Sequence, residues 1–103
     1  MARHHNITGV LTQELLESGD NTQIASISLA NVHASWGCYV DMYIEKKLTG
    51  KFYLIKGYVL HKGVNKTFNS SEIGFNNFAD EFGLYIKLTA FGSETPAVDV
   101  IIR

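Results

Sequence analysis

The side chains best suited to nucleophilic or acid–base chemistry in this sequence are its histidines and its single cysteine. Cys38 stands five residues after His33, but a Cys–His or Ser–His–Asp system also requires a concave site on which its members converge. No serine lies in a Gly-x-Ser-x-Gly sequence. Cys38, Val40 and Met42 occupy alternate positions of one expected strand and so lie on the same face, which predicts a buried, unreactive thiol.

The paired carboxylates Asp41 and Glu45 flank Tyr43 on one face of an expected strand, a pattern also found in carbohydrate sites. Positions four apart on a strand lie ~13 Å apart, whereas the carboxylates of glycosidases lie about 5–9.5 Å apart. The sequence also lacks Cys-x-x-Cys and His-x-x-x-His spacings and glycine-rich phosphate loops. We therefore expect no catalytic residues, no metal and no cofactor.

The elements that carry these residues are predicted to be strands, because apolar and polar residues alternate with a period of two. Four segments alternate clearly: 25–30, 38–45, 82–89 and 98–103. Two more are expected over 51–61, with a bulge or bend at Gly57, and over 64–68, after a turn at Gly63. Residues 9–16 fit a helical stripe as well as a strand, and we favour the strand.

Seven strands with short polar turns in 103 residues indicate one all-β domain. We expect a single antiparallel β-sandwich of about seven to eight strands, jelly-roll-like or immunoglobulin-like. The sandwich would cover 9–103, preceded by an extended arm over 1–8. The long connection 69–81 would hold a helical turn or a short strand. The expected core is Ile27, Leu29, Val40, Met42, Ile44, Leu54, Phe68, Leu84, Ile86, Leu88, Val98 and Val100, with Trp36 capping one end.

Charge is sparse in this chain. Nine Lys and Arg against ten Asp and Glu give a net charge of −1, which argues against nucleic acid or an anionic membrane as the main partner. The longest apolar runs are about five residues, too short to span a bilayer. The N-terminal residues lack the apolar core of a signal peptide. Only 18% of residues are charged, below the average of roughly 25%, which favours a surface that contacts protein.

Tyrosines are expected to occupy the outward positions of two strands. They admit two interpretations: ordinary cross-strand aromatic pairs, or a contact surface, since tyrosine is enriched at interfaces. The final strand also carries an outward apolar residue, and the arm is a candidate for packing against a neighbouring molecule. The candidate protein-contact residues are therefore Arg3, His4, Tyr39, Tyr43, Tyr85 and Ile101.

The order of strands and turns over residues ~22–103 resembles small virion structural proteins of tailed bacteriophages, especially marine cyanobacterial phages. The resemblance is carried by Ile27-Ser-Leu-Ala-Asn31, Val40-Asp-Met-Tyr-Ile44, Phe52-Tyr-Leu-Ile-Lys-Gly-Tyr-Val-Leu60, the turn at Gly63, Gly83-Leu-Tyr-Ile-Lys-Leu-Thr89 and Val98-Asp-Val-Ile-Ile-Arg103.

This resemblance implies a β-sandwich that is not an enzyme and that decorates or cements the assembled capsid. Its partners would be the major capsid protein or other virion proteins. It would be a homo-oligomer, for which a trimer is a common arrangement, and it would be made in the host cytoplasm and located in the virion. Two alternatives stay open: a neck or tail component, and a carbohydrate- or host-surface-binding module that uses Tyr39, Asp41, Tyr43 and Glu45.

Overall fold

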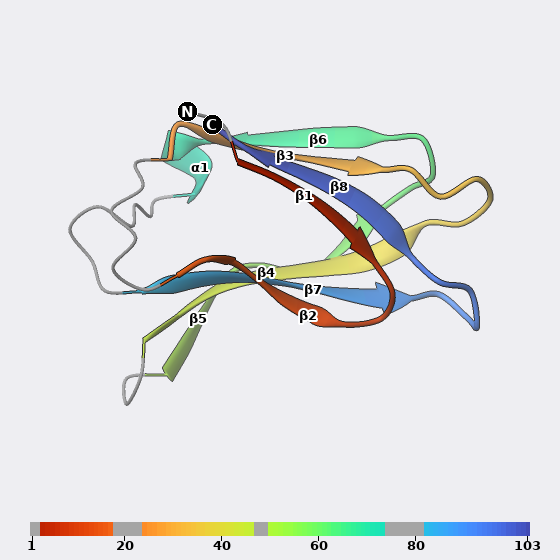
Figure 1. Cartoon of the computed structure of the whole chain (residues 1–103), viewed down its shortest axis with the longest axis horizontal. Helices are drawn as coiled ribbons and strands as arrows, with labels where there is room; N and C mark the ends of the chain where they lie inside the picture. The colour runs from red at the N-terminus through yellow and green to blue at the C-terminus, as the bar shows by residue number, and fades with distance from the viewer. Residues whose placement is uncertain (1–2, 18–23, 47–49, 74–81) are drawn as a thin grey trace.

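A computed structural model describes residues 3–17, 24–46, 50–73 and 82–103 (Figure 1). Its elements are β1 (Arg3–Thr8), β2 (Thr12–Leu16), β3 (Ser26–Asn31), β4 (Cys38–Lys46), β5 (Gly50–Leu60), β6 (Asn65–Asn69), α1 (Ser70–Ile73), β7 (Gly83–Ala90) and β8 (Ala97–Ile102). The single helical turn α1 is the one described helix, and it is far too short to cross a bilayer.

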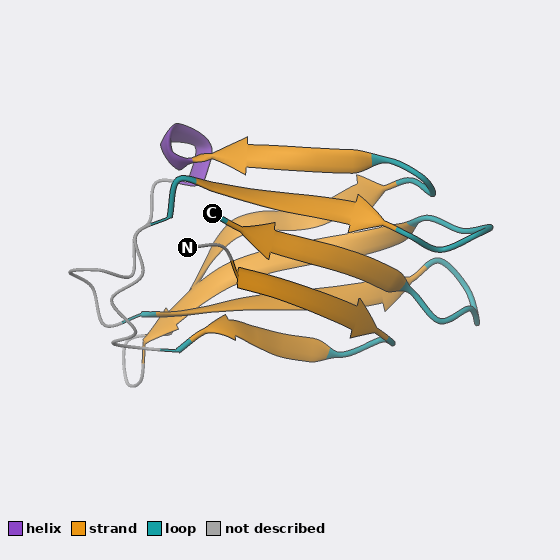
Figure 2. Ribbon diagram, turned by 45° about the horizontal axis from the view of Figure 1, so that its top comes forward, coloured by secondary structure: helices purple, strands orange, loops and turns teal. Residues whose placement is uncertain are grey.

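The eight strands form two antiparallel sheets of four, which face each other as a sandwich (Figures 1 and 2). The first sheet has the order β1-β8-β3-β6 and the second the order β2-β7-β4-β5. Among the described strands, only β4 and β5 are consecutive in sequence and also paired. The remaining connections cross from one sheet to the other, which is the jelly-roll arrangement and not the immunoglobulin one. The predicted all-β sandwich is confirmed.

The core lies between the sheets, where each strand contributes its alternate residues. Strands β3 and β8 bury every second side chain, as their alternation predicts. Ten of the twelve expected core residues are buried, while Ile44 and Leu54 are partly buried against the core. The expectation that Trp36 caps the core is wrong. Its side chain is 51% exposed, because it stands in the β3–β4 connection, beyond the last paired residues of both sheets.

The expected N-terminal arm is also different in the structure. Residues 3–8 form β1, an edge strand that pairs with β8 from Arg3 opposite Ile102 to Thr8 opposite Ala97. This strand places Ile7 in the core. It lacks the usual strand signature because an edge strand with few inward positions needs few apolar residues. The sandwich therefore includes residues 3–8, as an eighth strand that the alternation did not reveal.

Strand β2 confirms the interpretation of residues 9–16 as a strand, and it also explains their helical appearance. The pairing of β2 with β7 shifts between Glu14 and Leu16. This bulge turns the adjacent side chains of Leu15 and Leu16 into the core, so the strict alternation is lost. The expected helical turn in the long connection is α1, where the Asn69 and Glu72 side chains each accept a hydrogen bond from the other's backbone amide. Residues 74–81 of that connection lie outside the described residues.

Candidate protein-contact surfaces

The predicted tyrosines lie together on the outer face of the second sheet. Tyr43 of β4 stands opposite Tyr85 of β7 and Tyr53 of β5. The rings of Tyr43 and Tyr85 are stacked, with centroids 5.4 Å apart and planes 13° from parallel. The rings of Tyr43 and Tyr53 are tilted at 53°, with centroids 5.3 Å apart. The outward orientation predicted for Tyr39, Tyr43 and Tyr85 is correct.

Contacts within the chain already cover the centre of this aromatic row. Tyr43 is only 5% exposed, because the rings of Tyr53 and Tyr85 pack against its ring and Lys51 places its Nζ atom 4.9 Å from the ring centroid. Tyr39 is 41% exposed and packs against Phe91 of the β7–β8 connection. Tyr53, which the sequence did not single out, is 45% exposed. Cross-strand contacts therefore cover the Tyr43 ring, while the side chains of Tyr39 and Tyr53 remain accessible to solvent.

Tyr85 ends the row at a carboxylate of the neighbouring edge strand. Its hydroxyl donates a hydrogen bond to Oε2 of Glu14, over 2.9 Å. This hydrogen bond is the largest cause that raises the pKa of Tyr85 to about 12, with desolvation and the charge of Glu14 next. Tyr85 therefore stays a neutral hydrogen-bond donor throughout the physiological range.

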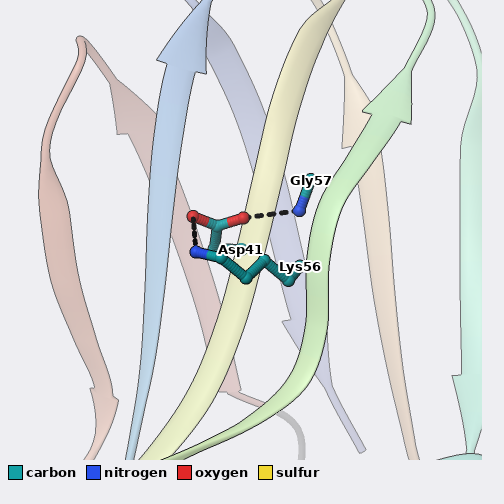
Figure 3. Close-up of polar contacts among 3 residues, drawn as sticks. All are labelled: Asp41, Lys56 and Gly57. Carbon is teal, nitrogen blue, oxygen red and sulfur yellow. Dashed lines mark hydrogen bonds and ion pairs between the residues drawn. The ribbon is translucent and has the colours of Figure 1, made fainter.

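Asp41 supports the bulge in the partner strand β5 (Figure 3). Its Oδ1 atom accepts a hydrogen bond from the backbone amide of Gly57 over 2.6 Å, and Lys56 Nζ lies 3.9 Å from Oδ2. Gly57 has a φ of +66°, a conformation that glycine adopts without steric cost. The bulge predicted at Gly57 is confirmed, and the Asp41 carboxylate is occupied by the backbone that forms it.

The outer face of the second sheet is consequently rich in charge as well as in tyrosine. Its outward side chains include Glu14, Asp41, Glu45, Lys51, Lys56 and Lys87. Opposite charges stand across from each other, with Asp41 paired to Lys87 and Glu45 paired to Lys51. Such pairs suit a solvated face.

The outer face of the first sheet is different, and we call it the charge-poor face. Its outward residues are His4, Asn6, Thr8, Ser26, Ser28, Ala30, Asn65, Thr67, Asn69, Ala97, Asp99, Ile101 and Arg103. Of these, only Asp99 and Arg103 carry a formal charge. Asp99 accepts a hydrogen bond from the Asn6 amide over 2.7 Å.

Two predicted contact residues meet on the charge-poor face. His4 and Ile101 stand directly opposite each other across β1 and β8, and neither belongs to the tyrosine row. Arg3 begins β1, and its side chain lies outside what the structure describes. The predicted set is thus divided between the two outer faces of the sandwich.

A third surface, which the sequence analysis missed, lies at one end of the sandwich. The connections β1–β2, β3–β4, β5–β6 and β7–β8 all lie at this end, shown on the right in Figure 1. We call these connections, residues 9–11, 32–37, 61–64 and 91–96, the loop end. Its exposed apolar side chains are Val10, Leu11, Val32, Trp36, Val64 and Phe91. A depression of about 420 Å³ lies between the β3–β4 and β5–β6 connections.

Polar side chains fix the connections of the loop end. The buried Asn31 amide donates to the carbonyls of Trp36 and Leu60 over 3.1 and 2.9 Å, and Asn31 Oδ1 accepts the amide of His33 over 2.9 Å. His33 Nδ1 in turn accepts the amides of Ser35 and Trp36. The histidine closest to Cys38 in sequence is therefore engaged in holding its own loop.

Glu94 has a comparable role in the β7–β8 connection. Its carboxylate oxygens accept the backbone amides of Phe91 and Gly92 over 2.8 and 3.0 Å. Desolvation acts to raise the pKa of Glu94, but backbone hydrogen bonds and the charge of nearby His33 outweigh it and hold the pKa below its ordinary value. Burial, followed by the charge of Glu94, raises the pKa of the Cys38 thiol. Over the described residues, no three His, Cys, Asp or Glu side chains gather as a metal site.

Comparisons with known proteins are informative about the fold alone. No family model and no curated protein matches the sequence. A mitogen derived from Yersinia pseudotuberculosis has a similar structure, with a TM-score of 0.58 at 7% identity, over 99% of this chain and 84% of that chain. A chain of the infectious bursal disease virus Gx strain has a TM-score of 0.46 at 14% identity, over 99% and 33%. The hydroxypropylphosphonic acid epoxidase from S. wedmorenis has a TM-score of 0.45 at 7% identity, over 99% and 43%.

Proposed function

We propose that this chain is a non-enzymatic virion structural protein that binds other virion proteins through the charge-poor face. The observation that carries the proposal is the composition of that face, where a four-stranded sheet presents a broad surface with two formal charges. The centres of protein interfaces are depleted of charge in the same way, because each buried charge must be paired or pay a desolvation cost. The resemblance of the strand order to phage virion proteins supports the assignment to a virion.

The central strands of the charge-poor face also have the shape that this function needs. Strands β3 and β8 present Ser26, Ser28, Ala30, Ala97, Asp99 and Ile101 there, all short or medium-sized side chains. A partner surface can approach such a sheet closely. Association through this face is favoured over strand addition at β2 or β5, because both of these edge strands have bulges that protect edges from pairing.

The leading form of the proposal is a decoration or cement protein on the assembled capsid, with the major capsid protein as its partner. A protein that binds the assembled shell and not its free subunits stabilises the shell by mass action. The alternative form is a neck or tail component, which would use the same face on a different partner.

Quantitative mass spectrometry of purified particles tests the assignment and separates its two forms. A decoration protein is expected at a copy number comparable to that of the major capsid protein. A copy number at least tenfold lower would favour the neck or tail. Absence of the chain from particles would contradict the virion proposal as a whole.

Binding to particles that lack the protein tests the face itself. Ile101→Lys places a charge at the centre of the charge-poor face and is expected to weaken binding at least tenfold. Thr89→Lys is the matched control, because Thr89 is also a partly exposed outward residue of a central strand, on the opposite sheet. Equal binding by the two variants would contradict the assignment of the face.

A carbohydrate- or host-surface-binding module is the second candidate, favoured by the exposure of Tyr39 and Tyr53 on the outer face of the second sheet. It ranks lower because Tyr43 is covered and the Asp41 carboxylate already binds Gly57. A glycan array tests it. Binding that Tyr53→Ala abolishes and Ile101→Lys leaves unchanged would establish this candidate, whereas an array without signal would exclude the glycans it carries.

A further inference from the structure

The strand order places the four connections of the loop end in a row. In the first sheet β1 lies beside β8, β8 beside β3 and β3 beside β6. The second sheet has the corresponding order β2, β7, β4 and β5, so each of its strands is joined at this end to the strand in the same place of the first sheet. Because each connection joins facing strands, the row runs β1–β2, β7–β8, β3–β4 and β5–β6. Figure 2 shows these four loops one above another at the right.

Every connection in this row exposes at least one large apolar side chain. The first exposes Val10 and Leu11, the second Phe91, the third Val32 and Trp36, and the fourth Val64. Among the described residues, these six are the majority of the ten large hydrophobic side chains that are exposed. Exposed apolar side chains that gather at one end of a molecule mark a candidate interaction site.

The connections of the loop end contain two formal charges. Glu94 lies in the second connection of the row and Lys62 in the fourth, so the third connection, with Trp36, lies between them. The Glu94 carboxylate is held in place by two backbone amides. In the order of the row, a two-fold axis at the third connection would bring the second connection of one copy against the fourth connection of the other, and so Glu94 against Lys62.

We propose that two copies of this chain associate through their loop ends about a two-fold axis near the β3–β4 connection. Trp36 lies close to the axis, and Lys62 of each copy faces Glu94 of the other. A closed two-fold interface requires one patch that is complementary to itself, whereas a foreign partner would require no such balance of opposite charges on the two sides of an apolar centre. This surface is separate from the charge-poor face, so the association does not depend on the proposed function.

The loop end is small for a specific interface. The two shorter dimensions of the molecule are 28 and 20 Å, and their product, an upper bound on the area of this end, lies just below the ~600 Å² per partner of the smallest specific interfaces. The dimer is therefore expected to dissociate on dilution, and its test must span a wide range of concentration.

Trp36 itself provides the readout, because it is the only tryptophan of the chain and is half-exposed in the monomer. Its fluorescence maximum should move to shorter wavelength as the concentration rises, in parallel with the monomer-to-dimer transition seen by sedimentation velocity. Lys62→Glu should weaken dimerisation at least tenfold and move both transitions together. Phe52→Ser is the control, because Phe52 is the comparably exposed aromatic of β5 at the other end of that strand, and it should leave both transitions unchanged.

Cross-linking locates the axis. With Cys38→Ala as background, Trp36→Cys should form an intermolecular disulfide under mild oxidation and Phe52→Cys should not. A chain that stays monomeric at all concentrations would overturn the proposal. So would a trimer, or a dimer that cross-links through Phe52→Cys and not through Trp36→Cys.

Discussion

The phenol ring of Tyr43 lies against that of Tyr85 in the next strand, with planes 13° from parallel. Both residues face away from the core, yet Tyr43 is buried, with only 5% of its surface exposed, because Tyr85, Tyr53 and Lys51 pack against its ring. The outer face of the second sheet thus has a small aromatic cluster of its own. Within this cluster Tyr43 has a structural role that its outward position does not suggest.

Removing the Tyr43 ring is expected to destabilise the protein substantially. Tyr43→Ala should lower the free energy of unfolding by about 3 kcal/mol, in the range for large buried aromatic residues. Tyr53→Ala should cost about 1 kcal/mol, because Tyr53 is nearly half-exposed. Urea denaturation measures both values. Similar losses for the two variants would contradict the special position of Tyr43.

Tyr85 is expected to ionise only at strongly alkaline pH. Its pKa is raised to about 12 by the hydrogen bond to Glu14, above the value of about 10 in the unfolded chain. Between these values the folded state binds more protons than the unfolded state, so stability is retained below pH ~10 and falls as the pH rises toward 12. Absorbance of the phenolate follows the titration, and Glu14→Gln should lower the pKa of Tyr85.

The matched variant for this effect is Tyr85→Phe, which removes the ionisable group and keeps the ring. Its free energy of unfolding should fall less steeply between pH 10 and 12 than that of the original chain. An identical slope for the two proteins would show that Tyr85 does not contribute.

The bulge at Gly57 should be sensitive to the side chain placed there. Gly57→Ala is expected to lower the free energy of unfolding by about 1–2 kcal/mol, because alanine resists the positive φ. Gly57→Asn should cost less, since asparagine tolerates this conformation. An added Cβ atom would meet nothing within 4 Å, so a difference between the variants would report on the backbone and not on packing. Thermal unfolding measures it.

Asn31→Asp should make stability depend on pH. The new carboxylate would face the carbonyl oxygens of Trp36 and Leu60, to which the Asn31 amide now donates, and these would raise its pKa in the folded state above ~3.9. Stability would then be highest below that pH and would fall as the pH rises through the raised pKa. Urea denaturation should show a deficit relative to Asn31 that is larger at pH 7 than near pH 4.

Asn31→Ser separates this charge effect from the loss of hydrogen bonds. It should cost about 1–3 kcal/mol at both pH values, because buried acceptors lose their partner. If Asn31→Asp also showed equal deficits at the two pH values, repulsion by the carbonyl oxygens would not be its cause.

The strands of the core were predictable from alternation alone, as β3 and β8 show, because burial between two sheets imposes a period of two on each strand. Strand β1 was not predictable in this way, because it has a single core residue, Ile7, and one apolar residue makes no alternation. The jelly-roll order was also beyond the sequence. It depends on pairings such as β1 with β8, between residues almost a full chain length apart, and no local signal encodes these.

The candidate surfaces show the same limit. Parity correctly placed Tyr39, Tyr43 and Tyr85 on an outer face, but the covering of Tyr43 follows from a register that passes across the Gly57 bulge. The loop end was missed because its apolar residues are single members of four polar connections. They become a patch only when the strand order brings those connections to one end.

The position of β8 between β1 and β3 has a consequence for how the chain reaches this structure. Strand β1 has no partner in its sheet until residues 97–102 are in place, so the earliest-made strand must wait for one of the latest. Pairing over such a distance is slow, because the entropy of closing the loop is lost before contacts reward it. During synthesis the first sheet therefore stays incomplete, and folding is expected to finish only after residues 97–102 have left the ribosome.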